Sequence, residues 1–262
     1  MTAAGPGGSV AGAIAAGLSM AGAGLIAVAG YTSGWILAAA VALSVLGLAA
    51  GWGPLLHLPH PAGTSVVVAV TGIAGLVVAA LVRDQSRPLE AFAAVVALAV
   101  LAAFGHELAR RDGRPDVVES ITGTLAGQVM AILAAGWLLL SQPWQGTVTQ
   151  TEGRHAVLVA AAVVAAARLA SALPWGLAVT GWVGFALGVG AAGVTSVLVD
   201  GVGAGRAITT GVTVAGVAAA IDRLLGAELE GDRRSVALLA ASAAPVAAAG
   251  TVAYAAARIM AG

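Results

Sequence analysis

Long apolar stretches, separated by short groups of turn-forming and charged residues, run along the whole chain. Most reach about 18 residues or more, the length at which a helix crosses a hydrocarbon core of roughly 30 Å. Residues 155–199 are too long for one span, and we divide them at SALPWG because Pro174 disfavours helix at the residue before it. The pattern predicts nine spans, at about 9–29, 34–52, 64–82, 88–108, 117–140, two within 155–199, 206–226 and 235–257.

The predicted fold class is therefore all-α, a polytopic transmembrane helical bundle of about eight to ten spans that forms one integral membrane domain over residues 1–262. Composition supports this prediction, since 60% of the residues are hydrophobic, 9% are charged and the mean hydropathy is +0.98. A soluble domain of this length needs far more charge to cover its surface.

Two residue types are missing from the chain. Without Cys it has no disulfide, no thiolate metal site and no Cys nucleophile. Without Lys, all twelve basic residues are Arg, which together with abundant Ala, Gly and Val indicates a GC-rich bacterial genome. We therefore expect a multi-pass protein of the bacterial cytoplasmic (inner) membrane.

Orientation follows from the distribution of Arg between alternate links. If the N-terminus is cytoplasmic, seven Arg lie on the cytoplasmic side and five on the other, and this excess favours that orientation. Trp35, Trp52, Trp144 and Trp175 fall at span ends, where we expect an interfacial aromatic belt. Gly184 and Gly188 form a small-xxx-small pair that favours close helix packing.

The fragment GHELARRDGRPDVVES, residues 105–120, holds an unusual share of the charge. Glu107 can pair with Arg110 and Arg111 on one helix face, and Asp112-Gly113 predicts a turn. Asp116 and Glu119 have the spacing of a capping box for the next helix. The fragment thus ends one helix and starts another, or else it forms a binding site; the charged cluster comprises Glu107, Arg110, Arg111, Asp112, Arg114 and Glu119.

Within this fragment, LARRDGR resembles the loop signature of major-facilitator transporters, Leu-Ala-Asp-Arg-x-Gly-Arg, in which an acid–arginine cluster joins two helices. Leu108, Ala109, Arg111, Gly113 and Arg114 match, whereas Arg110 stands at the position of the Asp. That family also has twelve spans, so we do not assign the chain to it. The stretch RRDGRPDVVESITGT, residues 110–124, is similar to polytopic actinobacterial membrane proteins of unknown function, which implies lineage and architecture only.

A polar stripe follows the charged fragment, because Asp116, Ser120, Thr124 and Gln128 recur every fourth residue and share one helix face. Polar groups are unfavourable against lipid, so this face must contact other helices or water. Two interpretations stay open: the lining of a substrate path or cavity, and hydrogen bonding between helices.

Three further ionisable residues lie inside predicted spans: Arg168, Asp222 and Arg223. Because each is within two turns of a predicted helix end, we expect them to reach the interface as anchors. Pro59 and Pro61 break the helical spacing of His57 and His60, so we predict no metal site, and we predict no cofactor. DGVGAGR, residues 200–206, is a flexible link or a Gly-rich phosphate cradle near Arg206.

Two classes of function remain open at this point. The preferred hypothesis is a transporter or lipid flippase, or a component of a membrane complex. The alternative is a membrane-embedded enzyme acting on lipid phosphates or nucleotides, with a divalent ion held by link carboxylates such as Asp112, Asp116, Glu228 and Asp232. Expected partners are membrane lipid and a protein or second copy docked on Gly/Ala-rich helix faces, and no nucleic acid.

Overall fold

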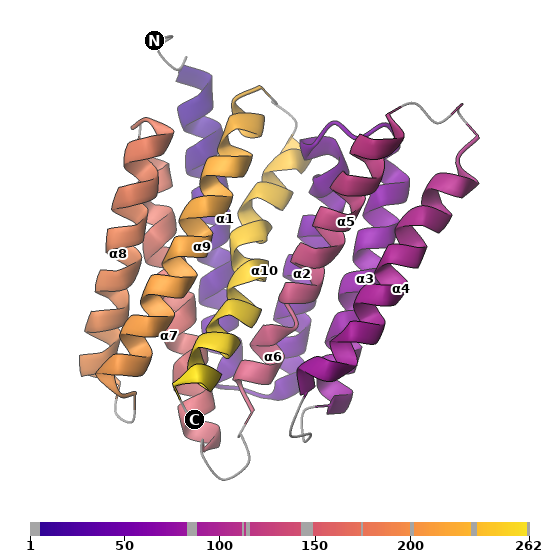
Figure 1. Cartoon of the computed structure of the whole chain (residues 1–262). Coiled ribbons are helices and arrows are strands. Elements are labelled where there is room, and N and C mark those ends of the chain that lie inside the picture. The colour runs from indigo at the N-terminus through magenta and orange to yellow at the C-terminus, as the bar shows by residue number, and fades with distance from the viewer. Residues whose placement is uncertain are drawn as a thin grey trace.

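The computed structural model describes residues 6–82, 88–111, 113, 116–142, 149–173, 175–199, 202–231 and 235–260. Over these residues the fold is all helical and contains nine helical segments long and apolar enough to cross a membrane, which confirms the predicted bundle (Figure 1). In chain order the elements are α1 (Pro6–Gly30), α2 (Gly34–Leu55), α3 (Pro61–Val82), α4 (Pro88–Ala109), α5 (Val117–Leu133), α6 (Gly136–Leu140), α7 (Gln150–Leu169), the short 3-10 helix η1 (Ala170–Ala172), α8 (Leu177–Leu198), α9 (Ala204–Gly231) and α10 (Ser235–Ile259).

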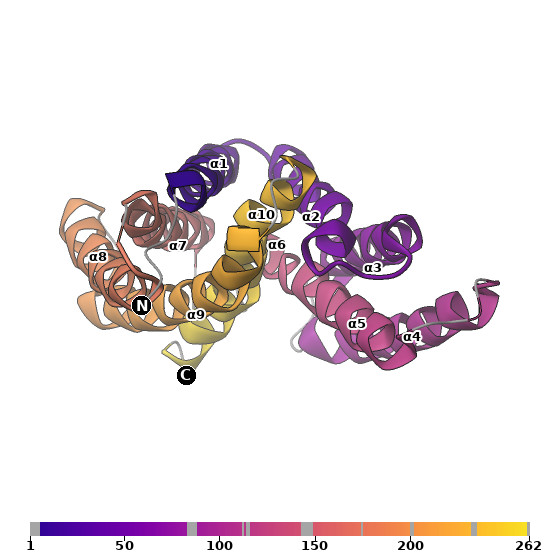
Figure 2. The same cartoon turned by 90° about the horizontal axis from the view of Figure 1, so that it is seen from above.

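Helix α10 lies in the middle of the bundle (Figure 2). On one side of it are α1, α7, α8 and α9, and on the other side are α2, α3, α4 and α5 with α6. Residues 240–250, AASAAPVAAAG, are all buried, because their small side chains let neighbouring helices approach α10 from every direction. Helix α1 begins and helix α10 ends at opposite faces of the bundle, here called the N-terminal and C-terminal faces (Figure 1).

The predicted span at 117–140 is divided into α5 and α6 at Ala134–Ala135. At this break the Trp137 amide donates to Ala134 O instead of to Leu133 O, and Thr251 Oγ1 of α10 donates to the freed Leu133 carbonyl at 2.7 Å. In return, Trp137 Nε1 donates to Val246 O of α10 at 2.8 Å. The break therefore joins α5 and α6 to the central helix by two hydrogen bonds.

Some helices begin earlier than their hydrophobic pattern predicts. Helix α7 begins at Gln150 rather than 155, since Thr149 and Glu152 form a capping box. Helix α3 begins at Pro61, a residue suited to the first helical turn.

The Gly184 and Gly188 pair packs as predicted, with α8 against Ala167 of α7 and Ala215 of α9.

Gly136 lets α6 approach the backbone of α10 closely, because a Cβ atom there would lie 2.2 Å from the Thr251 amide nitrogen. We predict that Gly136→Ala lowers the midpoint of thermal unfolding in detergent by several degrees, since overpacking costs about 1–3 kcal/mol or more. Gly190→Ala on α8 is the matched control: a Cβ there meets nothing within 4 Å. Equal midpoints for the two variants would contradict this packing.

Candidate functional site

A set of buried polar side chains lies between α3, α4 and α5, and we call it the polar column. It comprises Glu107, Arg110, Ser120, Thr64, Thr124, Thr71 and Gln128. Of the predicted stripe, Ser120, Thr124 and Gln128 face inward and are at most 1% exposed. Each forms a hydrogen bond with a residue of another helix.

An ion pair closes the column at the N-terminal face. Arg110, just beyond the end of α4, places Nη1 2.9 and 2.8 Å from the two carboxylate oxygens of Glu107. Ser120 of α5 donates to Glu107 Oε1. Both charged side chains are buried, at 4% and 6% residue exposure. The carboxylate thus links the end of α4 to α5.

The column continues to the middle of the span. The hydroxyls of Thr64 (α3) and Thr124 (α5) are 3.3 Å apart. One turn further, Gln128 Nε2 donates to Thr71 Oγ1 at 2.9 Å and to the Ala99 carbonyl of α4 at 3.0 Å. The carbonyl can only accept, so it fixes the amide orientation. The opposite atom, Gln128 Oε1, is buried and has no hydrogen-bond partner among the residues that the structure describes.

Trp52 of α2 packs against α5 next to the column. Its Nε1 donates to the Gly123 carbonyl of α5 at 2.7 Å, and its ring occupies the space that a Cβ at Gly127 would need. The prediction that Trp52 belongs to an interfacial belt is wrong, because Gly127 of α5 leaves room for its indole inside and the Gly123 carbonyl accepts its N–H. Trp35 and Trp175 are exposed as expected, and Trp144 lies outside the described residues.

The rest of the charged fragment does not join the column. Arg111, Asp116 and Glu119 are exposed, while Asp112 and Arg114 are outside the described part of the chain. The capping-box prediction for Asp116 is wrong: the residue has a left-handed backbone (φ 51) and its side chain forms no cap bond. A side-chain cap usually needs extended backbone at this position.

Two histidines lie beside the charged end of the column. The rings of His60, in the link before α3, and His106 of α4 pack edge to face with centroids 5.7 Å apart. Gly63 makes room for them, since a Cβ there would lie 2.1 Å from His106 Cε1. The sequence pattern did not bring these residues together, because His60 comes from the link before α3 and His106 from the last turn of α4.

A second buried polar network lies across α10 from the column. Arg168 of α7 forms an ion pair with Asp222 of α9, and Ser171 of η1 donates to the same carboxylate at 2.8 Å. Arg168 Nε also donates to Ser19 of α1, whose hydroxyl is 2.7 Å from the Ser242 carbonyl of α10. The network therefore connects α1, α7, α9 and α10 with η1.

The expectation that these residues reach the interface as anchors is wrong for Arg168. Arg168 is 4% exposed and turns inward instead of reaching the interface, because Asp222 and Ser19 satisfy it there. Arg223 is exposed, and its aliphatic chain lies close to Gly181 of α8. The serines that complete the network do not recur at a helical spacing, so the sequence does not predict that they meet.

The link carboxylates proposed for an enzyme are not gathered in the part of the chain that the structure covers. Asp116 and Glu228 are exposed and belong to the two different halves of the bundle (Figure 2). Asp112 and Asp232 lie outside the described residues. Among those described, no group of three or more His, Cys, Asp or Glu has the arrangement of a metal site.

Comparison with protein-family models, curated proteins and solved structures found no match for the chain. The resemblance to actinobacterial membrane proteins stays an expectation.

The second network gives a prediction about stability. Asp222→Ala leaves Arg168 buried without its carboxylate, and loss of one partner of a buried ion pair costs about 3–5 kcal/mol. Replacing both residues, as Arg168→Met with Asp222→Ala, should recover much of that loss. Arg223→Gln, at the neighbouring exposed position, should change stability by no more than about 0.5 kcal/mol. Equal unfolding midpoints for Asp222→Ala and Arg223→Gln in detergent would contradict the buried pair.

Proposed function

We propose that the protein is a membrane protein of the transporter or flippase type, and that a polar species moves along the polar column. The arrangement of the described residues then corresponds to a closed conformation. The Arg distribution supports placing the N-terminal face in the cytoplasm of a bacterium. On that basis the column begins on the cytoplasmic side of the inner membrane.

One observation carries the proposal: the column leads from an ion pair at one face to an unsatisfied acceptor, Gln128 Oε1, near the middle of the Val117–Leu140 span. A buried acceptor without a donor costs about 1–3 kcal/mol, so packing alone is a poor reason to keep it. A translocated donor group or water passing this point would satisfy it. Ionisable residues within spans are functional candidates for the same energetic reason.

The two ends of the proposed path are closed in different ways. At the N-terminal face the Glu107–Arg110 pair and Ser120 close it by polar contacts. Beyond Gln128, towards the C-terminal face, the core is apolar, with buried Ala131 and Ile132 following on α5. Opening that half requires movement of helices, and the break between α5 and α6 is a place where α6 can change its angle.

The absence of native Cys allows a direct test with Thr124→Cys in the column and Val70→Cys as the control. Val70 is 65% exposed on α3, one residue before Thr71, so it faces lipid near the depth of Gln128. In the otherwise unchanged chain we expect both to react slowly with a small membrane-impermeant thiol reagent. Adding Glu107→Gln weakens the closing ion pair and should raise the rate at Thr124→Cys about tenfold or more.

The rate at Val70→Cys should not change when Glu107→Gln is added. An unchanged rate at Thr124→Cys would show that the column serves helix packing, and the membrane-complex interpretation would replace the transporter. Equal increases at both positions would indicate general loosening of the bundle and would also count against a path.

A further inference from the structure

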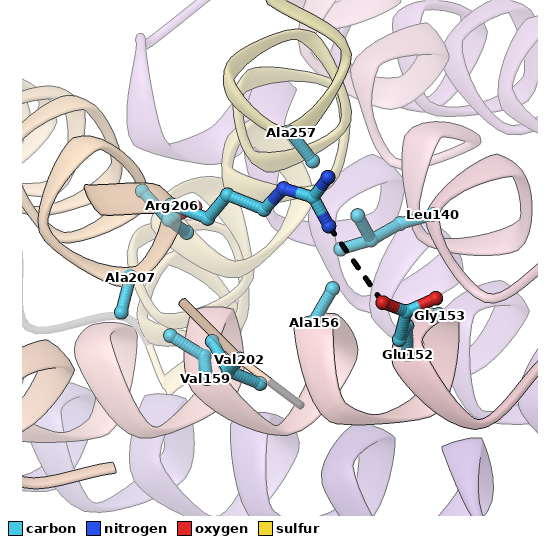
Figure 3. Close-up of a pocket in the computed structure, with 10 residues that line it drawn as sticks. Leu140, Glu152, Gly153, Ala156, Val159, Val202, Arg206, Ala207 and Ala257 are labelled. Carbon is cyan, nitrogen blue, oxygen red and sulfur yellow. Dashed lines mark ion pairs between the residues drawn. The ribbon is translucent and has the colours of Figure 1, made fainter. Parts of the chain in front are cut away.

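A pocket opens at the C-terminal face, between the end of α6, the first turns of α7 and α9, and the last turns of α10 (Figure 3). Its walls are apolar and include Leu140, Ala156, Val159, Val202 and Ala257. Its volume is about 40 Å³. A space of this size admits a small chemical group but not a whole lipid chain.

Two opposite charges lie among these apolar walls. Arg206, in the first turn of α9, extends across the pocket towards Glu152 of α7 (Figure 3). Its Nη1 is 3.9 Å from Glu152 Oε1, at the limit of an ion pair, and the side chains are 34% and 29% exposed. The pair is too long for a direct hydrogen bond, so both groups keep capacity for another partner.

The carboxylate of Glu152 is held in place by its own helix terminus. Oε2 accepts the Thr149 amide at 2.7 Å, and the Glu152 amide donates to Thr149 Oγ1 at 3.2 Å. This capping box leaves Oε1 directed towards Arg206. The pocket therefore presents a carboxylate oxygen held by the capping box beside the Arg206 guanidinium.

The opposite charges of Arg206 and Glu152 restrict the charge of any group that can bind between them. A lone anion on Arg206 would be repelled by Glu152, and a lone cation on Glu152 would be repelled by Arg206. A group that carries both charges a few atoms apart satisfies both residues. Because the pocket lies at the ends of spanning helices, where lipid head groups are concentrated, the group that fits is part of a membrane lipid.

We propose that this pocket binds the head group of a zwitterionic phospholipid, with the phosphate on Arg206 and the ammonium on Glu152. Phosphatidylethanolamine has this chemistry. Arg suits phosphate because its planar guanidinium offers several N–H donors, and Gly/Ala-rich walls let the head group approach the helices. The site is on the opposite face from the polar column and does not rest on the transport proposal.

The test uses purified full-length protein in detergent, incubated with equal amounts of phosphatidylethanolamine and phosphatidylglycerol, with the retained lipids counted by native mass spectrometry. Glu152→Gln keeps the capping box, since Gln also serves at this position, but removes the charge. It should lower retention of phosphatidylethanolamine about tenfold and leave phosphatidylglycerol unchanged or higher. Arg206→Gln should lower retention of both lipids about tenfold.

Arg223→Gln is the matched control, because Arg223 is an exposed arginine near the other end of α9. It should retain both lipids as the unchanged chain does. If Arg206→Gln behaves like this control, the pocket is no lipid site. If Glu152→Gln leaves the preference between the two lipids unchanged, the pocket does not recognise a zwitterion, and the proposal is wrong. Unfolding midpoints of all three variants separate loss of binding from loss of fold.

Discussion

The hydrocarbon core of the membrane offers no water, so every polar group inside the bundle must find its partner within the protein. This constraint accounts for the two buried networks and for the break in the fifth span. Where the helix loses its regular bond at Leu133, Thr251 of α10 replaces the missing donor. Where Arg168 turns inward, it forms an ion pair with Asp222 and donates a hydrogen bond to Ser19. Among the described residues, three buried side-chain atoms lack a hydrogen-bond partner: His106 Nε2, His155 Nδ1 and Gln128 Oε1. The two histidines lie near helix ends, whereas Gln128 lies near the middle of its span, on the column to which we assign the function.

Helix α10 forms hydrogen bonds both with the Arg168 network and with α6 beyond the helix break. Its Ser242 carbonyl accepts a hydrogen bond from Ser19, which belongs to the Arg168 network. Its Val246 carbonyl accepts one from Trp137 Nε1 of α6. One Ala-rich helix therefore contacts both halves of the bundle and the segment beyond the helix break. The charged end of the column lies at the N-terminal face, whereas the charged pocket lies at the C-terminal face. This separation suits a protein that exchanges a polar species at one face and contacts lipid head groups at the other.

The fold could be predicted because spans have a required length and their ends carry recognisable turn residues. The stripe of Ser120, Thr124 and Gln128 was also predictable, since a period of four places side chains on one helix face. Its partners were not, because Thr64 and Thr71 come from another helix and hydropathy does not specify which helices pack together. Trp52 and Arg168 were misplaced for the same reason: position near a span end does not show which way a side chain turns. The capping box of α7 was visible in the letters TQTE but lay in a stretch assigned to a link.

We propose above all that the Glu107–Arg110 pair holds the polar column closed. Hydrogen–deuterium exchange of the backbone amides, followed by mass spectrometry, tests it directly in the unchanged chain and in Glu107→Gln. The account predicts that amides of α5 between Ser120 and Gln128 exchange slowly in the unchanged chain and much faster in the variant. Amides of residues 240–250 in α10 should stay protected in both proteins. Equal protection of α5 in the two proteins would contradict the claim, because the column would then be closed by packing that the ion pair does not control.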